Sequence, residues 1–259
     1  MSWLNRLFGS KPSEPVQRSE PPQQPNKIIE AEPDSPQTFG YKTGWLAVRS
    51  DDAEALREAL GATNWQPANW ASGMRASHES NSKFAFLTPS INGWVLVHLG
   101  LALAPDHENG IARFEQWLEK LSAQFGEAQY FGSYRVVDFI AWMRAEKGEV
   151  TRAFSYVGSG DGILTNTGPV TGVEAIFNYE LLDGLTPEEA NNFMLEAEAE
   201  AEAEAEADDY LDAFEHLPDL SESVPMAIAA DWSIDPGKFG FDDTEPSTGY
   251  VARLEFLSG

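Results

Sequence analysis

The 259-residue sequence predicts an α+β domain in which helices pack on a mostly antiparallel sheet. Two pairs of apolar runs, within 83–100 and 139–157, flank short polar turns and indicate β-hairpins. A third segment, 109–126, repeats its apolar residues with helical periodicity. Helices and hairpins are mixed without the regular strand–helix alternation of a parallel sheet, so we expect antiparallel neighbours.

The first elements follow from caps and spacing. Tyr41–Arg49 is predicted to be a strand, and 51–61 a short helix. Asp51 or Asp52 suits the N-cap of that helix, two leucines follow at i, i+4 spacing, and Gly61 ends it. The next two apolar runs meet at Asn92-Gly93, which is typical of a two-residue hairpin turn.

The longest predicted helix has six apolar residues on one face and ends at Gly126: Ile111, Phe114, Trp117, Leu118, Leu121 and Phe125. Strands are expected over 139–145 and 150–157, and a turn-rich loop over 159–169. The pattern of 173–182 fits a strand or a short helix. Thr186 and Pro187 favour a helix start, and 249–259 is expected to be the final strand.

Residues 1–38 are expected to form a disordered tail, because they are rich in proline and glutamine and have little to bury. At the tip, Trp3, Leu4, Leu7 and Phe8 would share one face of a short helix. That tip could touch a membrane or a partner weakly. We favour an unstructured start, since two helical turns bury little area.

Residues 39–259 are expected to form one domain, interrupted by an acidic low-complexity segment at 196–209. With 42% hydrophobic residues, the chain can bury a sizeable core. Glutamate and alanine alternate in the segment, and both residue types favour helix over strand. We favour a solvated linker, because specific interfaces use varied side chains. Loose binding of a divalent cation is the weaker alternative, since the spacing of a calcium loop is missing.

The charge of the chain is strongly negative and uneven. The net charge is −25, and residues 153–237 hold 20 of the 42 acidic residues but no Lys or Arg. A phosphate backbone would be repelled, so we expect no nucleic-acid partner. A basic protein partner would be attracted and its encounter rate raised.

Motifs for catalysis and metal binding are missing from the sequence. There is no Cys, and the four histidines are not at metal-ligand spacing. The glycine-rich 158–162 has no P-loop lysine, and no G-x-S-x-G motif is present. We therefore expect no catalytic residue, no metal and no cofactor. No apolar run approaches the length of a membrane span and no secretory signal is seen, so we expect a cytoplasmic protein without stable membrane insertion.

Two groups of residues are the candidate partner-binding positions. The first combines acids with the neighbouring Tyr210, Leu211 and Phe214, and consists of Asp208, Asp209, Asp212 and Glu215. The second is Trp65 and Trp70, in a segment of weak periodicity where an exposed Trp pair could anchor a partner. For these tryptophans, packing on the core is the favoured alternative.

Most of residues 40–237 resembles uncharacterised bacterial cytoplasmic proteins that we group with the immunity proteins of polymorphic, contact-dependent toxin systems. The likeness is carried by GYKTGWLAVRSDDAEALREALG, FLTPSINGWVLV, LSAQFGEAQYFGSYRVVDFIAWMRAEKGEVTRAFSYVG and IAADWSIDP. It is a likeness of strand and helix segments, without a catalytic motif. The Glu-Ala repeat and the Pro-rich tail lie outside it.

This resemblance implies an acidic cytoplasmic protein without a cofactor that covers the catalytic cleft of a cognate toxin. A basic toxin domain is then the expected partner. An accessory or scaffold protein tethered through its N-terminal segment is the first alternative. The second is an enzyme of unrecognised type, because antiparallel α+β folds host many activities.

Overall fold

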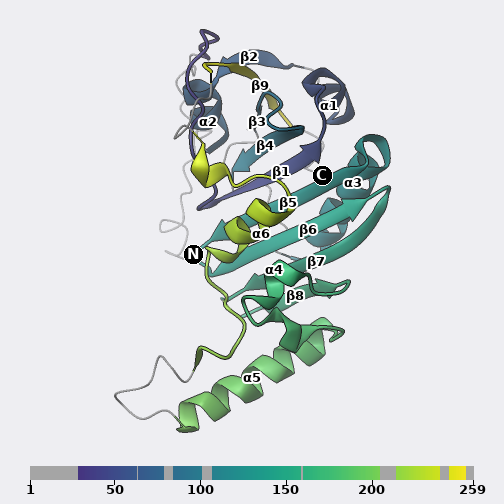
Figure 1. Ribbon diagram of the computed structural model, residues 1–259, viewed down its shortest axis with the longest axis vertical. Helices are drawn as coiled ribbons and strands as arrows, with labels where there is room; N and C mark the ends of the chain where they lie inside the picture. Colours follow the sequence, from purple (N-terminus) through teal and green to yellow (C-terminus); the bar gives the residue numbers. More distant parts are fainter. Residues whose placement is uncertain are drawn as a thin grey trace, which may run out of the picture.

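A computed structural model describes residues 29–62, 64–78, 84–100, 107–158, 160–204, 214–239 and 245–254. Within these residues, nine strands form one sheet in the order β2-β9-β3-β4-β1-β5-β6-β7-β8 (Figure 1), and every neighbouring pair is antiparallel. The strands are β1 (Thr43–Arg49), β2 (Gln66–Asn69), β3 (Phe84–Leu87), β4 (Trp94–Gly100), β5 (Glu127–Tyr134), β6 (Phe139–Glu146), β7 (Glu149–Val157), β8 (Gly162–Thr167) and β9 (Thr248–Arg253). The predicted α+β class is confirmed.

Helices cover both faces of this sheet. The described helices are α1 (Ala53–Ala59), α2 (Trp70–His78), α3 (Glu108–Phe125), α4 (Gly172–Ala175), α5 (Pro187–Glu204) and α6 (Val224–Trp232), with 3-10 turns η2 (Tyr179–Leu182) and η4 (Pro236–Lys238). Apolar side chains of α1 and α3 pack in the core on one face. Those of α2, α5, α6 and η2 pack in the core on the other face. The sheet is thus the middle of three layers.

Strand β1 shows why the central strands are apolar throughout. Trp45 and Ala47 face the core under α2 and α6, while Leu46 and Val48 face the core under α3. All four side chains are fully buried. A strand buried on both faces has no polar face, so its sequence is a continuous apolar run rather than an alternating one.

Local sequence signals located several caps and turns correctly, although the weakly periodic segment around Trp65 and Trp70 did not reveal β2 and α2. The Asp52 side chain accepts hydrogen bonds from the backbone N–H groups of the first turn of α1, as an N-cap does. Asn92 and Gly93 have φ of 51° and 80°, the left-handed geometry that a two-residue hairpin turn requires. The turn between β6 and β7 has the same geometry at Lys147 and Gly148.

Two predicted boundaries were wrong, and one open alternative is resolved. Strand β8 lies inside the expected loop 159–169, where the alternation of Ile163 and Thr165 toward the interior was obscured by flanking glycines. The ambiguous 173–182 is helical, because Thr171 and Glu174 form a capping box that starts α4. The domain begins before residue 39, since Asp34 accepts hydrogen bonds from the first N–H groups of α2 at 2.6 and 3.0 Å. The remainder of the expected tail, 1–28, lies outside the described residues.

The Glu-Ala repeat is helical as far as it is described. Helix α5 runs through Glu204, and residues 205–209 lie outside the described residues. Ala190, Met194 and Ala201 are buried on one side of α5, and α5 lies along β8, the last strand of the sheet (Figure 1). A small apolar stripe therefore docks the helix, while most of its glutamates face solvent.

Asn191 of α5 closes the exposed edge of β8. Its Oδ1 accepts from the Ile163 N–H at 2.7 Å, and its Nδ2 donates to the Ile163 carbonyl at 2.9 Å. One amide side chain thus replaces the two hydrogen bonds that a tenth strand would make. Covering an edge in this way protects it from pairing with another chain.

Replacing Asn191 with alanine should destabilise the domain by roughly 1–3 kcal/mol, because two backbone groups of Ile163 lose their partners. The exposed neighbour Asn192 is a matched control, because replacing it with alanine changes the helix propensity of α5 by the same amount. Urea unfolding of Asn191→Ala and Asn192→Ala measures the difference. Equal midpoints for the two variants would contradict the proposed closure of the edge.

Candidate functional site

Only part of the predicted partner-binding residues lies within the described part of the chain. Asp208, Asp209 and Asp212 lie outside the described residues, together with Tyr210 and Leu211. Glu215 is described and exposed. Of the two readings of Trp65 and Trp70, an exposed pair is not observed, and the favoured packing on the core holds for Trp70.

The two tryptophans pack on opposite faces of the sheet. Trp70 is fully buried beside Phe86 and Phe239, and its Nε1 donates to Ser247 Oγ at 3.0 Å. Trp65 is half-buried against the other core, and its Nε1 donates to the Arg57 carbonyl. The alternative of core packing therefore holds for Trp70, and no paired anchor exists.

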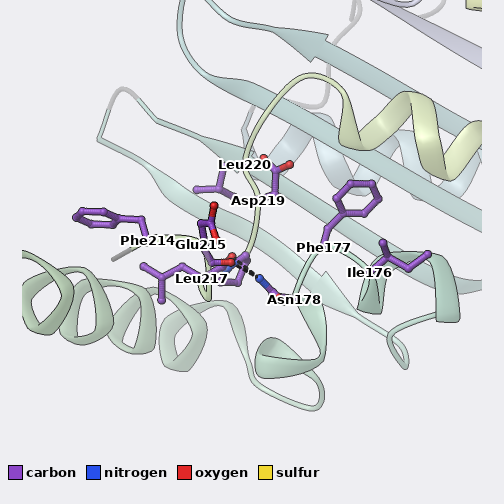
Figure 2. Close-up of a pocket in the computed structure, with 9 residues that line it drawn as sticks. Ile176, Phe177, Asn178, Phe214, Glu215, Leu217, Asp219 and Leu220 are labelled. Carbon is purple, nitrogen blue, oxygen red and sulfur yellow. Dashed lines mark hydrogen bonds between the residues drawn. The ribbon is translucent and has the colours of Figure 1, made fainter. Parts of the chain in front are cut away.

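Glu215 belongs to a pocket of about 510 Å³ (Figure 2), a volume within the usual range of ligand-binding pockets. One wall is the chain from the end of α4 to the start of η2, and the other is the segment that precedes α6. The lining residues are Ile176, Phe177, Asn178, Phe214, Glu215, Leu217, Pro218, Asp219 and Leu220. We call these nine residues the acidic pocket.

Backbone hydrogen bonds hold the two walls together. Asn178 adopts φ 65°, and from this left-handed position its Nδ2 donates to the carbonyls of Glu215 and Leu217 at 2.9 and 3.0 Å (Figure 2). The Asp219 N–H donates to the Phe177 carbonyl, and the Tyr179 hydroxyl donates to the Asp219 carbonyl at 2.7 Å. Asparagine tolerates this conformation better than most residues, so the pocket is preformed.

The exposed surface of the lining is mainly polar, although six of the nine lining residues have apolar side chains. Leu217 and Pro218 are buried, and Ile176 is the exposed apolar side chain, 75% exposed at the rim. Among the described residues, no ion pair involves Glu215 or Asp219, and no Lys or Arg lines the pocket. Such a surface suits a ligand with an apolar side chain beside a cationic group.

A buried ion pair fixes the helical wall of the acidic pocket to the sheet. Arg152 Nε of β7 lies 2.7 Å from Glu174 Oε1 of α4, and both side chains are almost fully buried. Trp142 Nε1 donates to the same oxygen, while Glu174 Oε2 accepts from the N–H and hydroxyl of Thr171. Arg152 Nη1 also donates to the carbonyls of Thr167 and Gly168. The pair is inaccessible, so its role is structural.

Removing Arg152 alone should cost about 3–5 kcal/mol of stability, because Glu174 would stay buried without its partner. The double variant Arg152→Met/Glu174→Leu should recover much of that loss, since no charge is then left in the core. Denaturant unfolding of both variants measures this. The ion-pair argument fails if Arg152→Met is no less stable than the double variant.

A second group of buried, hydrogen-bonded polar side chains lies on the same face of the sheet, in its other half. His98 of β4 lies between Ser77 Oγ of α2, 2.7 Å from Nδ1, and Thr43 Oγ1 of β1, 2.8 Å from Nε2. All three residues are buried, so a substrate cannot reach this serine–histidine pair. Burial, with a smaller effect of the neighbouring His78, lowers the pKa of His98 to about 3. The neutral ring is a satisfied core residue.

This histidine should make stability depend on pH. Its folded-state pKa of about 3 lies below the ordinary value near 6.5, so the unfolded chain takes up the proton first as the pH falls. The contribution of His98 to the free energy of unfolding is zero above pH ~6.5. It becomes destabilising between pH ~6.5 and ~3, and reaches roughly 2–3 kcal/mol near pH 4.5. His98→Gln should lose this slope, whereas His216→Gln, at an exposed position, should keep it. Parallel curves for all three proteins in urea unfolding at several pH values would contradict the assignment.

Burial also raises the pKa of the Tyr179 hydroxyl well above its ordinary value. That hydroxyl therefore remains a hydrogen-bond donor to Asp219 at neutral pH. On α5, hydrogen bonds from Thr186 lower the pKa of Glu189, in agreement with the predicted helix start. The Tyr179 hydroxyl thus supports the backbone of the acidic pocket, and the Glu189 carboxylate supports the first turn of α5.

Comparisons with known proteins add no further assignment. No family model matches the chain, and neither a curated protein nor a solved structure matches it. Within the described residues, no group of His, Asp or Glu is arranged to hold a metal ion. In the same part of the chain, every helix is too short or too polar to cross a membrane. The resemblance to immunity proteins stays a prediction.

Glu215, a candidate partner-binding residue from the sequence, and the neighbouring Phe214 both line the acidic pocket, and their role in binding stays a prediction. Sequence reasoning missed Ile176, Asn178 and Asp219. A capping-box pattern at 171–174 and an Asn after two apolar residues were visible in the sequence. Neither signal reveals that 176–178 and 214–220 meet, because that contact depends on long-range hydrogen bonds.

Proposed function

We propose that this chain is a binding protein that covers a basic region of another protein, as an immunity protein covers a toxin. The observation that carries the proposal is the acidic pocket, where an exposed apolar rim borders carboxylates without a cationic neighbour. The partner would place an apolar side chain in the pocket and Lys or Arg at its edge. Burial of the apolar group supplies affinity, and the charges supply orientation and rate.

The surroundings of the acidic pocket support the same partner chemistry. The pocket lies within residues 153–237, which hold 20 acidic residues and no Lys or Arg. On α5, Glu196, Glu200 and Glu202 are exposed. A field of one sign over one part of a surface attracts an oppositely charged protein from a distance, and salt screens that attraction.

Exposed apolar residues are also concentrated in this part of the chain. Five large hydrophobic side chains are exposed among the described residues, and Ile176, Leu181 and Leu195 come from the α4–α5 region. Single exposed hydrophobics are common on any protein, and of these three only Ile176 lines the acidic pocket. Occlusion of a toxin cleft by this surface is the form of the proposal that the resemblance favours.

The product of the neighbouring gene, co-expressed and co-purified, is the partner to test first. Ile176→Ser should weaken its binding about tenfold, or ~1.4 kcal/mol, because the exposed apolar rim is removed. Val136→Ser is the matched control, since Val136 is 68% exposed but lies in the turn between β5 and β6, away from the acidic pocket. Calorimetry at two salt concentrations measures both effects.

High salt should slow association of the wild-type protein and of both variants alike, because the acidic residues remain. Equal affinities for Ile176→Ser and Val136→Ser would exclude the acidic pocket as the binding site. Survival of cells without this protein when they meet the cognate toxin would exclude the immunity role and leave only the binding role.

A further inference from the structure

The sequence itself contains a segment with the chemistry that fits the acidic pocket. Met1–Lys11 carries four large apolar residues, Trp3, Leu4, Leu7 and Phe8, at spacings that place them on one side of a helix. It also carries Arg6 and Lys11 and no acidic residue. Its charge is opposite to that of the pocket, and its apolar residues would contact the exposed apolar side chain of Ile176 at the rim.

We propose that Met1–Lys11 occupies the acidic pocket of its own chain until a partner displaces it. The apolar residues would contact the lining around Ile176 and Leu220, and the two cations would lie near Glu215 and Asp219. The proposal rests on the proposed function in one respect, because both assign ligand binding to the same pocket. It goes further by naming an occupant within the chain.

The chain that joins the segment to the domain is long enough. Seventeen residues, five of them proline, lie between Lys11 and Ile29, and a polyproline chain of that length spans roughly 53 Å at ~3.1 Å per residue. Glu30 accepts a hydrogen bond from Asn69 of the edge strand β2, so the connection starts at that side of the sheet. Nine strands at ~4.8 Å spacing are only about 38 Å wide.

The path also stays on one face of the sheet. Ile29 packs against the same core as Phe177 and Leu220 of the acidic pocket. The segment therefore does not need to pass around a sheet edge to reach the pocket. Two helical turns bind weakly as a free peptide, but a tether of this kind raises the effective concentration to the millimolar range. A weak intramolecular contact is then populated and remains easy for a partner to displace.

The absence of cysteine from the chain allows a direct test in the full-length protein. A spin label on Ser2→Cys should broaden the methyl NMR signals of Ile176, Leu217 and Leu220, which surround the acidic pocket. The methyl signals of Leu56, in α1 on the opposite face, are the internal control and should keep their intensity. The label changes no residue of the pocket, so folding is not at stake.

Two comparisons make the result decisive. Leu7→Asp/Phe8→Asp in the labelled chain should restore the pocket signals, and added salt should restore them in part. Full intensity at the pocket methyls, or equal loss at Leu56, would overturn the proposal. So would broadening that appears only when labelled and isotope-enriched copies are mixed, because the occupant would then be a second copy.

The outcome is separable from that of the proposed function. If the spin-label test fails, the proposed binding of a partner is still tested independently by comparing Ile176→Ser with Val136→Ser. If the proposal holds, Leu7→Asp/Phe8→Asp should bind the same partner more tightly than the wild-type chain, because no segment has to be displaced. Unchanged or weaker binding by that variant would contradict displacement.

Discussion

The buried contact between Arg152 and Glu174 is the interaction on which the acidic third of the molecule depends. It joins β7 to α4 where the chain leaves the sheet, and Trp142 and Thr171 satisfy the remaining hydrogen bonds of the carboxylate. Burying two charges is costly unless the geometry is good and other polar groups complete it. The carboxylate of Glu174 meets this condition, whereas Arg152 Nη2 is buried without a hydrogen-bond partner among the described residues. The path of 168–182 over the sheet, and with it one wall of the acidic pocket, follows from this pair.

Beyond that pair, neutral amide side chains make several of the contacts that attach this region. Asn166 Nδ2 donates to the carbonyls of Leu182 and Leu185, Asn178 bridges the walls of the acidic pocket, and Asn191 closes the β8 edge. Amide groups offer both donors and acceptors without adding charge. Some surface carboxylates of this acidic region also hold the backbone, since Asp183 accepts a hydrogen bond from the Val170 N–H and Asp219 accepts one from the Ser221 N–H.

The sequence was informative where structure is local. The Asp52 cap, the Asn92-Gly93 turn and the helix ending at Gly126 each depend on residues a few positions apart, and all three are observed. Strand β8 and the acidic pocket depend on distant partners such as Asn191 and the 214–220 segment, so local patterns could not place them. Glu215 was selected as a candidate because acidic and apolar residues are mixed in its segment. The exposure of Ile176 is a property of the folded chain and cannot be read from the sequence.

A second pocket shows why charge alone does not define a binding surface. About 330 Å³ in volume, it is lined partly by Arg49, Arg144 and Lys147, but Glu127 pairs with both arginines and Glu146 pairs with Arg144. The two arginines are paired within the chain, so an anion would have to displace an existing carboxylate to reach them. The carboxylates of the acidic pocket have no ion pair among the described residues, although Asp219 Oδ1 accepts a hydrogen bond from the Ser221 N–H. A cationic ligand there meets carboxylates without a competing cation, which makes that pocket the better receptor for a basic ligand.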